Sequence, residues 1–223
     1  SDSLLSEAQQ FEAYNRLTTF LMHDLNNLIA QQSLIVTNAE KHKRNPEFVD
    51  DAIQTIANSV DRMKKVMHQL RRGRGSGEKK MTELRFVVSA AVEECAMRQP
   101  SPELILGEAG GSIEVNADEF RTVLAHIIRN AQDATPDDGT VTVTLECKDG
   151  KAEISIEDTG SGMSIEFVRD RLFRPFDTTK GAEGMGIGAY QAREFVRRLG
   201  GEMMVDSSVS KGTRVRIALD LAG

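Results

Sequence analysis

Asp158-Thr159-Gly160-Ser161-Gly162-Met163, followed by Gly184-Met185-Gly186-Ile187-Gly188, is the stretch that decides the fold. The first element follows an alternating segment, 152–157, which predicts a β-strand. An aspartate at a strand end accepts a hydrogen bond from an exocyclic amine, and glycines in a tight turn let the backbone approach a flat ring. The second element precedes an expected helix, 189–199, whose N-terminus attracts phosphates. Together they predict a nucleotide site, against the alternative of two ordinary glycine-rich turns.

Further motifs stand around these glycines in a fixed order. Residues 126–134 (HIIRNAQDA) resemble the N box of the ATPase superfamily that gyrase, Hsp90, MutL and histidine kinases share, and the two glycine elements resemble its G1 and G2 boxes. Residues 172–180 (LFRPFDTTK) resemble the F box of nitrogen-regulator-type sensor kinases. Residues 20–29 (FLMHDLNNLI) resemble the H box, which carries a phosphorylated histidine. The chain is thus similar, over nearly its whole length, to the catalytic core of a two-component sensor histidine kinase.

The residues that follow the H box narrow this resemblance. Gln31-Gln32 and Asn45-Pro46-Glu47-Phe48 are most similar to the kinase associated with bacterial PEP-CTERM/exosortase systems. The resemblance implies that the chain binds ATP and Mg²⁺, forms a homodimer, and passes a phosphoryl group to an aspartate in the receiver domain of a response regulator. It also implies that any membrane attachment lies in segments absent from this chain.

Composition sets the broad class of protein. The 223 residues carry a formal net charge of -6, which argues against a nucleic-acid partner. The two cysteines, Cys95 and Cys147, have no metal-ligand spacing and form no disulfide framework, so a reducing cytoplasm is expected. No apolar run reaches the roughly 20 residues that span a bilayer, and the first residues do not follow the pattern of a signal peptide.

Residues 1–72 are expected to form a helical hairpin for dimerisation and histidine phosphotransfer. The second helix carries a heptad seam: Val49, Ile53, Ile56, Val60, Met63, Met67 and Leu70. The first helix carries a matching stripe: Tyr14, Leu17, Leu21, Leu25, Leu28 and Ile35. Since one hairpin buries little apolar surface, two hairpins are expected to form a homodimeric four-helix bundle. The alternative is that the seam packs against the second domain.

The remaining residues are expected to form a linker and a second domain. Residues 73–80 (GRGSGEKK) have the composition of a flexible linker, and the lack of aromatics disfavours a nucleic-acid patch. In residues 81–223, the pattern predicts helices at 86–98 and 117–134 and strands at 141–145, 152–157, 202–206 and 213–219. The fold class is therefore an all-α hairpin followed by an α+β sandwich of the histidine kinase/gyrase/Hsp90 type. Residues 173–184 lack periodicity and are expected to form a lid.

His23, Asp24 and Asn27 are the catalytic candidates of the hairpin. The nitrogen of a neutral imidazole is nucleophilic near physiological pH, which suits attack by His23 on a γ-phosphate. The resemblance implies that Asp24 accepts a hydrogen bond from the other ring nitrogen, although adjacent residues do not share a helix face. Asn27 lies four residues after His23, on the same face. By resemblance it positions water for dephosphorylation of the regulator; the alternative is a polar surface residue.

The N box supplies the metal candidate. By resemblance, the side-chain oxygen of Asn130 binds Mg²⁺, whose other ligands are phosphate oxygens and waters. Asp133 is a further candidate that faces the nucleotide. His126 stands where hydrolytic members of the superfamily have a glutamate that activates water and kinases more often have asparagine. This departure favours phosphotransfer over hydrolysis, and His126 itself is interpreted as a helix histidine whose hydrogen bonds are satisfied.

The glycine boxes supply the other contacts to ATP. Asp158 is expected to bind the adenine amine, and Gly160 and Gly162 to allow close approach. Lys180, in the expected lid, offers a point charge to the phosphates or is simply solvated. Gly184, Gly186 and Gly188 are expected to line the triphosphate.

Two functions compete with the kinase. A kinase-like module that binds ATP and dimerises with weak catalysis is disfavoured because the glycines and Asn130 are all present. A superfamily ATPase is disfavoured by His126 and by the helical hairpin.

Overall fold

The computed structural model describes the backbone of residues 2–72, 78–108, 110–173 and 188–222. The chain divides into two compact units, Ser1–Gly75 and Ser76–Gly223. The first consists of helices and the second combines helices with a mixed sheet, which confirms the expected fold class. Within the described ranges, no helix is long and apolar enough to cross a membrane.

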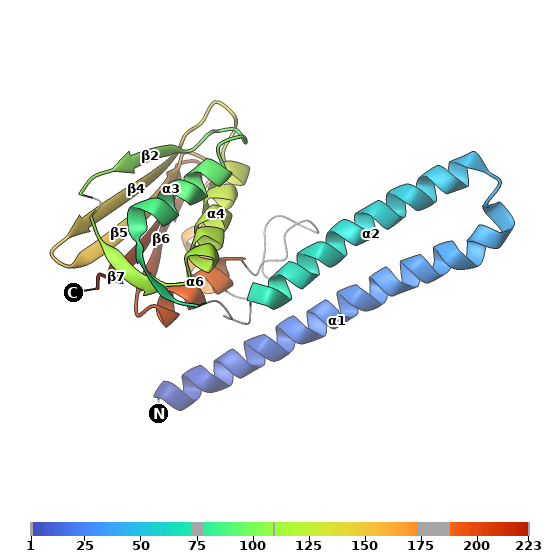
Figure 1. Ribbon diagram of the computed structural model, residues 1–223, viewed down its shortest axis with the longest axis horizontal. Coiled ribbons are helices and arrows are strands. Elements are labelled where there is room, and N and C mark those ends of the chain that lie inside the picture. The colour runs from blue at the N-terminus through green and yellow to red at the C-terminus, as the bar shows by residue number, and fades with distance from the viewer. Residues whose placement is uncertain (1, 73–77, 109, 174–187, 223) are drawn as a thin grey trace. The chain divides into compact units, whose positions relative to one another are not determined.

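The first unit is a hairpin of two long helices, α1 (Asp2–His42) and α2 (Pro46–Arg72), which run antiparallel in Figure 1. Asn45 begins α2 as an N-cap, since its Oδ1 accepts a hydrogen bond from the backbone N–H of Glu47 at 3.1 Å. Proline at the first helical position needs no N–H partner. The short turn between the helices therefore follows directly from the sequence.

The two helices pack through a narrow inner face. Leu21 and Leu28 on α1 and Val66 on α2 are buried between them. Half-way along, the Gln32 amide Nε2 donates to the Ser59 hydroxyl at 2.9 Å. The hairpin thus combines a few apolar contacts with polar contacts between its helices.

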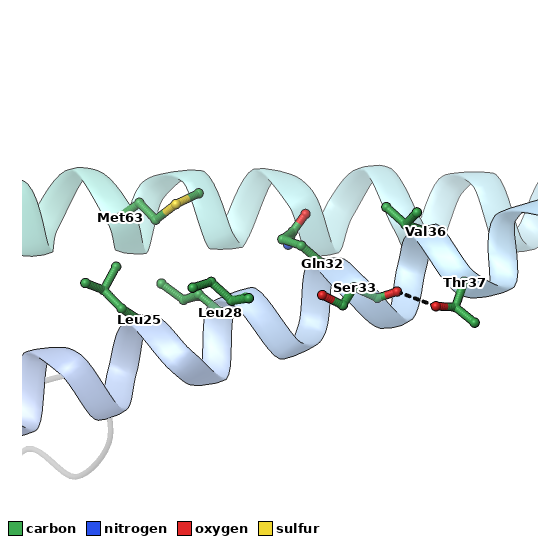
Figure 2. A pocket seen from close by; sticks show the side chains of 8 residues that line it. Leu25, Leu28, Gln32, Ser33, Val36, Thr37 and Met63 are labelled. Carbon is green, nitrogen blue, oxygen red and sulfur yellow. Dashed lines mark hydrogen bonds between the residues drawn. The ribbon is translucent and has the colours of Figure 1, made fainter.

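Most of the predicted seam of α2 is exposed. Ile53 is 60% exposed and Met67 is 53% exposed, and Val49, Ile56 and Val60 are exposed as well. Beside this seam lies an apolar groove, shown in Figure 2, with these lining residues: Leu25, Leu28, Ile29, Gln32, Ser33, Val36, Thr37 and Met63. The side chains of Tyr14, Leu17 and Leu70 lie outside the described residues. A single hairpin therefore leaves much of its apolar surface uncovered.

The second unit is built on a five-stranded sheet in the order β2-β4-β5-β7-β6. Its strands are β2 (Glu103–Leu106), β4 (Val141–Lys148), β5 (Lys151–Asp158), β6 (Glu202–Ser208) and β7 (Gly212–Asp220). β2 runs parallel to β4, and the other pairs are antiparallel. A separate pair joins β1 (Lys80–Glu83) and β3 (Ser112–Val115).

Three helices cover one face of the sheet in Figure 1: α3 (Leu84–Glu94), α4 (Ala117–Ala134) and α6 (Gly188–Arg198). A short helix, α5 (Ile165–Asp170), follows the first glycine box. The core lies between helices and sheet, where Phe120 of α4 and Ile154 of β5 are fully buried. Strands β4 and β5 bury every second side chain against the helices, which explains the alternation in their sequence.

The expected elements differ from the observed ones in two ways. α3 ends at Glu94 and not at 98, because the carbonyls of Cys95, Arg98 and Pro100 accept hydrogen bonds from the Gln132 side chain and the chain turns there. Strands β1, β2 and β3 and helix α5 were not predicted. Each of these strands has four residues, too few for alternation to stand out.

Candidate functional site

His23 lies on the exposed surface of α1 next to Asn27. The Nδ2 atom of Asn27 is 3.3 Å from Nδ1 of His23. The contact arises because residues four apart on a helix share a face. Nδ1 is therefore the ring nitrogen that lies next to the Asn27 amide.

Asp24 points the other way, into the hairpin. It is only 4% exposed, and its two oxygens accept hydrogen bonds from Nε and Nη2 of Arg62 on α2, at 2.8 and 2.6 Å. This bidentate hydrogen bonding raises the pKa of Arg62. Asp24 thus ties α1 to α2 directly behind His23, whereas the contact with the histidine ring in this structure comes from Asn27.

Asp158 ends β5 and is buried, at 5% exposed. Its Oδ1 accepts hydrogen bonds from the backbone N–H groups of Gly160 at 2.8 Å and Thr213 at 3.3 Å. Burial raises the pKa of Asp158 above its ordinary value, and these backbone hydrogen bonds partly offset the rise. A carboxylate fixed at a strand end in this manner is suited to recognise one amine of a ligand.

The glycines of the first box allow the turn to pack closely against neighbouring backbone. A Cβ on Gly160 would overlap the carbonyl of Ala134 at the end of α4. Gly162 has φ +64, and a Cβ there would overlap the carbonyl of Ser208. Hydrogen bonds from Ser161 N to the Ala134 carbonyl (2.9 Å) and from Met163 N to the Ser207 hydroxyl (2.8 Å) hold the same turn. These glycines are needed for the close packing of the turn, and the approach of a ring stays a prediction.

The N box lies on the last turns of α4. Asn130 is half-buried, and its Nδ2 is 3.2 Å from Nε2 of His126, one turn earlier. Asp133 forms an ion pair with Arg98, so this side chain has a structural contact in the protein. Gln132, only 2% exposed, directs its Nε2 at the carbonyls of the turn after α3. The N box thus combines a polar pair, His126 and Asn130, with an anchor for the neighbouring turn.

The second glycine box ends where α6 begins, at Gly188. The start of this helix packs on the N box, since a Cβ on Gly188 would overlap the imidazole of His126. Further along α6, the Arg193 guanidinium lies 4.2 Å from the centroid of the Phe173 ring, and burial lowers the pKa of Arg193. Lys180, Gly184 and Gly186 lie outside the described residues, as do most of the expected lid and residues 73–77 of the expected linker.

The residues present fit ATP with Mg²⁺ in one particular way. In the part of the chain that the structure describes, no three His, Cys, Asp or Glu side chains gather into a metal site. Mg²⁺ commonly takes one or two protein oxygens and completes its octahedron with phosphates and waters. Asn130 fits this arrangement, and the N-terminus of α6 fits a phosphate group.

Three residues that shape these sites were not singled out from the sequence. Arg62 holds Asp24, Gln132 holds the turn after α3, and Thr213 holds Asp158. Their partners lie 38, 32 and 55 residues away in the chain. Local spacing carries no signal for contacts of this kind.

Comparison with known proteins places these features in a family context. Residues 115–223 match the family of histidine kinase-, DNA gyrase B- and HSP90-like ATPases. All of the glycine-box and N-box residues discussed above lie within this ATPase domain, and the histidine-bearing hairpin precedes it.

Sensor kinases are among the relatives. Histidine protein kinase DivJ of Caulobacter vibrioides is 39% identical over 115 residues, which cover 49% of this chain and 19% of that protein. Sporulation kinase D of Bacillus subtilis is 26% identical over 225 residues, which cover 97% of this chain and 44% of that protein. The chain therefore spans less than half the length of these curated relatives.

A solved structure matches both units. The crystal structure of histidine kinase ThkA in complex with response regulator protein TrrA has a TM-score of 0.69 and 18% identity, and the match covers 96% of this chain and 64% of that chain. At this identity the likeness shows the fold.

Proposed function

We propose that this chain is the core of a sensor histidine kinase, which phosphorylates His23 with ATP. The observation that carries the proposal is the buried carboxylate of Asp158, which backbone N–H groups fix at the end of β5 inside the matched ATPase domain. The kinase relatives and the exposed histidine on a preceding helical hairpin support it.

Each residue has a distinct task in this reaction. Asp158 accepts a hydrogen bond from the adenine amine, while Asn130 supplies an oxygen to Mg²⁺ and the start of α6 faces the phosphates. Nε2 of His23 forms a bond to the γ-phosphorus as the bond from that phosphorus to the β–γ bridging oxygen breaks, and ADP leaves. Mg²⁺ supplies charge neutralisation of the phosphates when bound. Catalysis then rests on positioning and on electrostatic stabilisation of the transferred phosphoryl group.

The tautomer of His23 decides which nitrogen reacts. Nε2 has a lone pair only when the ring proton is on Nδ1, and the neighbour of Nδ1 in this structure is the side-chain amide of Asn27. The structure has Nδ2 of the amide next to Nδ1; half a turn of the amide brings Oδ1 there, where it accepts a hydrogen bond from Nδ1–H. Asn27 thereby takes part of the orienting task that the resemblance gave to Asp24, whose oxygens are engaged by Arg62.

The test is incubation of the full chain with γ-labelled ATP and Mg²⁺. We expect label that is stable in base and labile in acid, as a phosphohistidine is. ATP binding without any label would favour the alternative function, a kinase-like module that binds ATP and dimerises. Release of phosphate without labelled protein would favour an ATPase.

We also propose that the phosphoryl group passes to a response-regulator aspartate and that Asn27 assists the later hydrolysis of that phosphoaspartate by water. ThkA, which shares this fold, was solved with the response regulator TrrA. Asn27 lies one turn beyond His23 on the exposed face where a regulator would meet the phosphohistidine. Transfer of label from the chain to purified receiver domains measures the first step, and loss of label from the receiver measures the second.

We propose further that the hairpin pairs with a second copy. The exposed seam of α2 and the adjoining groove are apolar surfaces that a single chain leaves in water. Val60→Glu brings two like charges together near the two-fold axis and is expected to dissociate the dimer. Sedimentation of the parent chain and the variant measures this, with Lys65→Glu, exposed on another face of α2, as control. A monomeric parent chain would contradict the proposal.

The narrower resemblance to the kinase of PEP-CTERM/exosortase systems stays a prediction. Two of the residues behind it have structural tasks in this hairpin: Gln32 bonds Ser59, and Asn45 caps α2. Competitive phosphotransfer to receiver domains from such a system and from unrelated systems tests the prediction. Preferred transfer to the former supports it.

A further inference from the structure

We propose that His126 is a positioning residue, which turns the amide of Asn130 so that its oxygen faces Mg²⁺, and that Gly188 holds the imidazole in place. The inference rests on the proposed function, because it concerns the same nucleotide site. It assigns a task to a histidine that the sequence left as a satisfied helix residue.

The first observation is the contact between the two side chains. Nδ2 of Asn130 lies 3.2 Å from Nε2 of His126, at a half-buried position on α4. An amide nitrogen only donates, so this arrangement requires a lone pair on Nε2 and the ring proton on Nδ1. The imidazole then accepts a hydrogen bond from the amide nitrogen, and the amide oxygen points to the other side.

The second observation is the contact across to α6. A Cβ on Gly188 would overlap Nε2, Cδ2 and Cε1 of the His126 ring. The ring therefore packs directly on the backbone where the second glycine box becomes a helix. Gly188 does not have a left-handed φ, so the imidazole and not the backbone conformation requires glycine here.

The consequence follows from the symmetry of an amide. Rotation of the Asn130 side chain by half a turn exchanges its oxygen for an NH₂ group, which cannot bind a cation. The lone pair on Nε2 of His126 accepts a hydrogen bond only from the NH₂ group of Asn130. This hydrogen bond therefore favours the orientation in which the amide oxygen is directed at the metal. Loss of such a supporting partner typically lowers metal affinity by about 10- to 100-fold.

Two variants of similar size separate this role from simple packing. In His126→Gln, the side chain is long enough to place an amide oxygen near the position of Nε2 and so restores an acceptor. In His126→Leu, volume is kept but no acceptor remains. A structural role alone predicts that the more polar glutamine is no better than leucine at a half-buried position.

The measurement is the affinity of the full chain for a fluorescent ATP analogue with and without Mg²⁺. We expect His126→Leu to lose about tenfold in the gain of affinity that Mg²⁺ provides, with metal-free affinity unchanged. His126→Gln is expected to keep most of the gain. Electron paramagnetic resonance of Mn²⁺ in place of Mg²⁺ should report the same order of metal affinities. Equal losses with and without metal, or equal behaviour of both variants, would overturn the proposal.

A double-mutant cycle tests the contact with Gly188. Gly188→Ala alone is expected to displace the ring and to reduce the Mg²⁺-dependent gain. In a chain that already carries His126→Ala, the added methyl group enters vacated space and is expected to cause no further loss. Additive losses would overturn the assigned contact, and thermal unfolding of all four chains verifies that each is folded.

The matched control is the other histidine–asparagine pair of the chain. His23→Leu removes the imidazole that lies four residues before an asparagine on α1. It is expected to leave the gain in nucleotide affinity that Mg²⁺ provides unchanged. This control also separates the two hypotheses. If the proposed kinase activity fails but the metal effect of His126→Leu remains, the inference about Asn130 stands as a property of nucleotide binding.

Discussion

Two pairs of residues in this chain have the same spacing and opposite tasks. His23 and Asn27 lie four apart on α1, and His126 and Asn130 lie four apart on α4. The first pair is exposed and the amide meets Nδ1, and the reaction proposed for Nε2 needs the amide turned so that its oxygen faces Nδ1. The second pair is half-buried and the amide meets Nε2, which packs under Gly188. In the roles proposed above, the asparagine orients the histidine in the first pair, and the histidine orients the asparagine in the second.

The difference shows that local spacing sets which side chains meet but burial sets what they do. Both contacts follow from helix geometry. An exposed imidazole exchanges its neighbours with water and stays available to a phosphate. A covered imidazole holds one partner and acts only through it. Variants of each pair and of its surroundings test this contrast.

The largest effect is expected at the exposed histidine. His23→Gln should abolish labelling by γ-labelled ATP, because no other atom of the pair is a comparable nucleophile. Affinity for ATP should stay within about twofold, since the variant does not touch the buried Asp158 site. His42→Gln, at an exposed position beside Phe48, is the control. Undiminished label on the His23 variant would contradict the contrast between a reactive His23 and a positioning His126.

The second effect concerns the buried side of the comparison. Asn130→Ala should remove most of the affinity that Mg²⁺ adds, about tenfold or more, whereas Asp158→Ala should weaken ATP and ADP alike with or without metal. Titrations in both conditions separate the two. An equal loss for Asn130→Ala in both conditions would contradict its role at the metal.

Asp158 also gives a pH dependence with a defined sign. Burial raises its pKa above the ordinary value of 3.8, so on acidification it protonates earlier than an exposed aspartate. Protonation removes negative charge from the acceptor of the adenine amine, and affinity for ADP should therefore fall as pH decreases through the raised pKa. Asp158→Asn should bind more weakly and show a flatter acidic limb. If ADP affinity falls equally steeply with decreasing pH in both chains, the pH dependence belongs to another group.

A third effect tests the support behind the exposed pair. Arg62→Met leaves the carboxylate of Asp24 buried without its cation and should lower the free energy of unfolding of the hairpin by about 1–3 kcal/mol. This is less than the 3–5 kcal/mol typical of a fully buried pair, because the Arg62 side chain is 51% exposed. Chemical denaturation measures the change, with the exposed Lys64→Met as control. Unchanged stability would show that water replaces the guanidinium.

The smallest effect on the kinase is expected at Asn27. Asn27→Ala should lower labelling of His23 by only about two- to fivefold, the loss of one exposed hydrogen bond of roughly 0.5–1 kcal/mol. Dephosphorylation of the regulator should fall more, because hydrolysis needs a positioned water. If both activities fall alike, Asn27 acts through the histidine alone.

Patterns that involve neighbouring residues were predictable from sequence. Helix α4 was expected at its observed bounds, since its apolar period is clear and Asn116 caps it by accepting from the N–H of Glu119 at 2.8 Å. The two strands of the β4–β5 hairpin were expected from their alternation, and the turn between them has positive φ at Asp149 and Gly150.

Features that depend on distant partners were not predictable. The expected role of Gly160 and Gly162 was access for a ligand, but the atoms that exclude a Cβ belong to Ala134 and Ser208 of the protein itself. Likewise, the acid beside His23 was expected to meet the ring, and its partner is Arg62 on the other helix. Only the folded chain shows which surface occupies the space beside a residue.

The pairing of β5 with β7 has a consequence for the order of folding. It sets Asp158 opposite Thr213, 55 residues later, so the carboxylate gains its second backbone donor only after a long loop has closed. Contacts between distant residues tend to form late, whereas the β4–β5 hairpin is local. A nucleotide that recognises the completed strand end binds after this closure. ATP should therefore prolong the lifetime of the folded domain by slowing its unfolding, and should leave its folding rate almost unchanged.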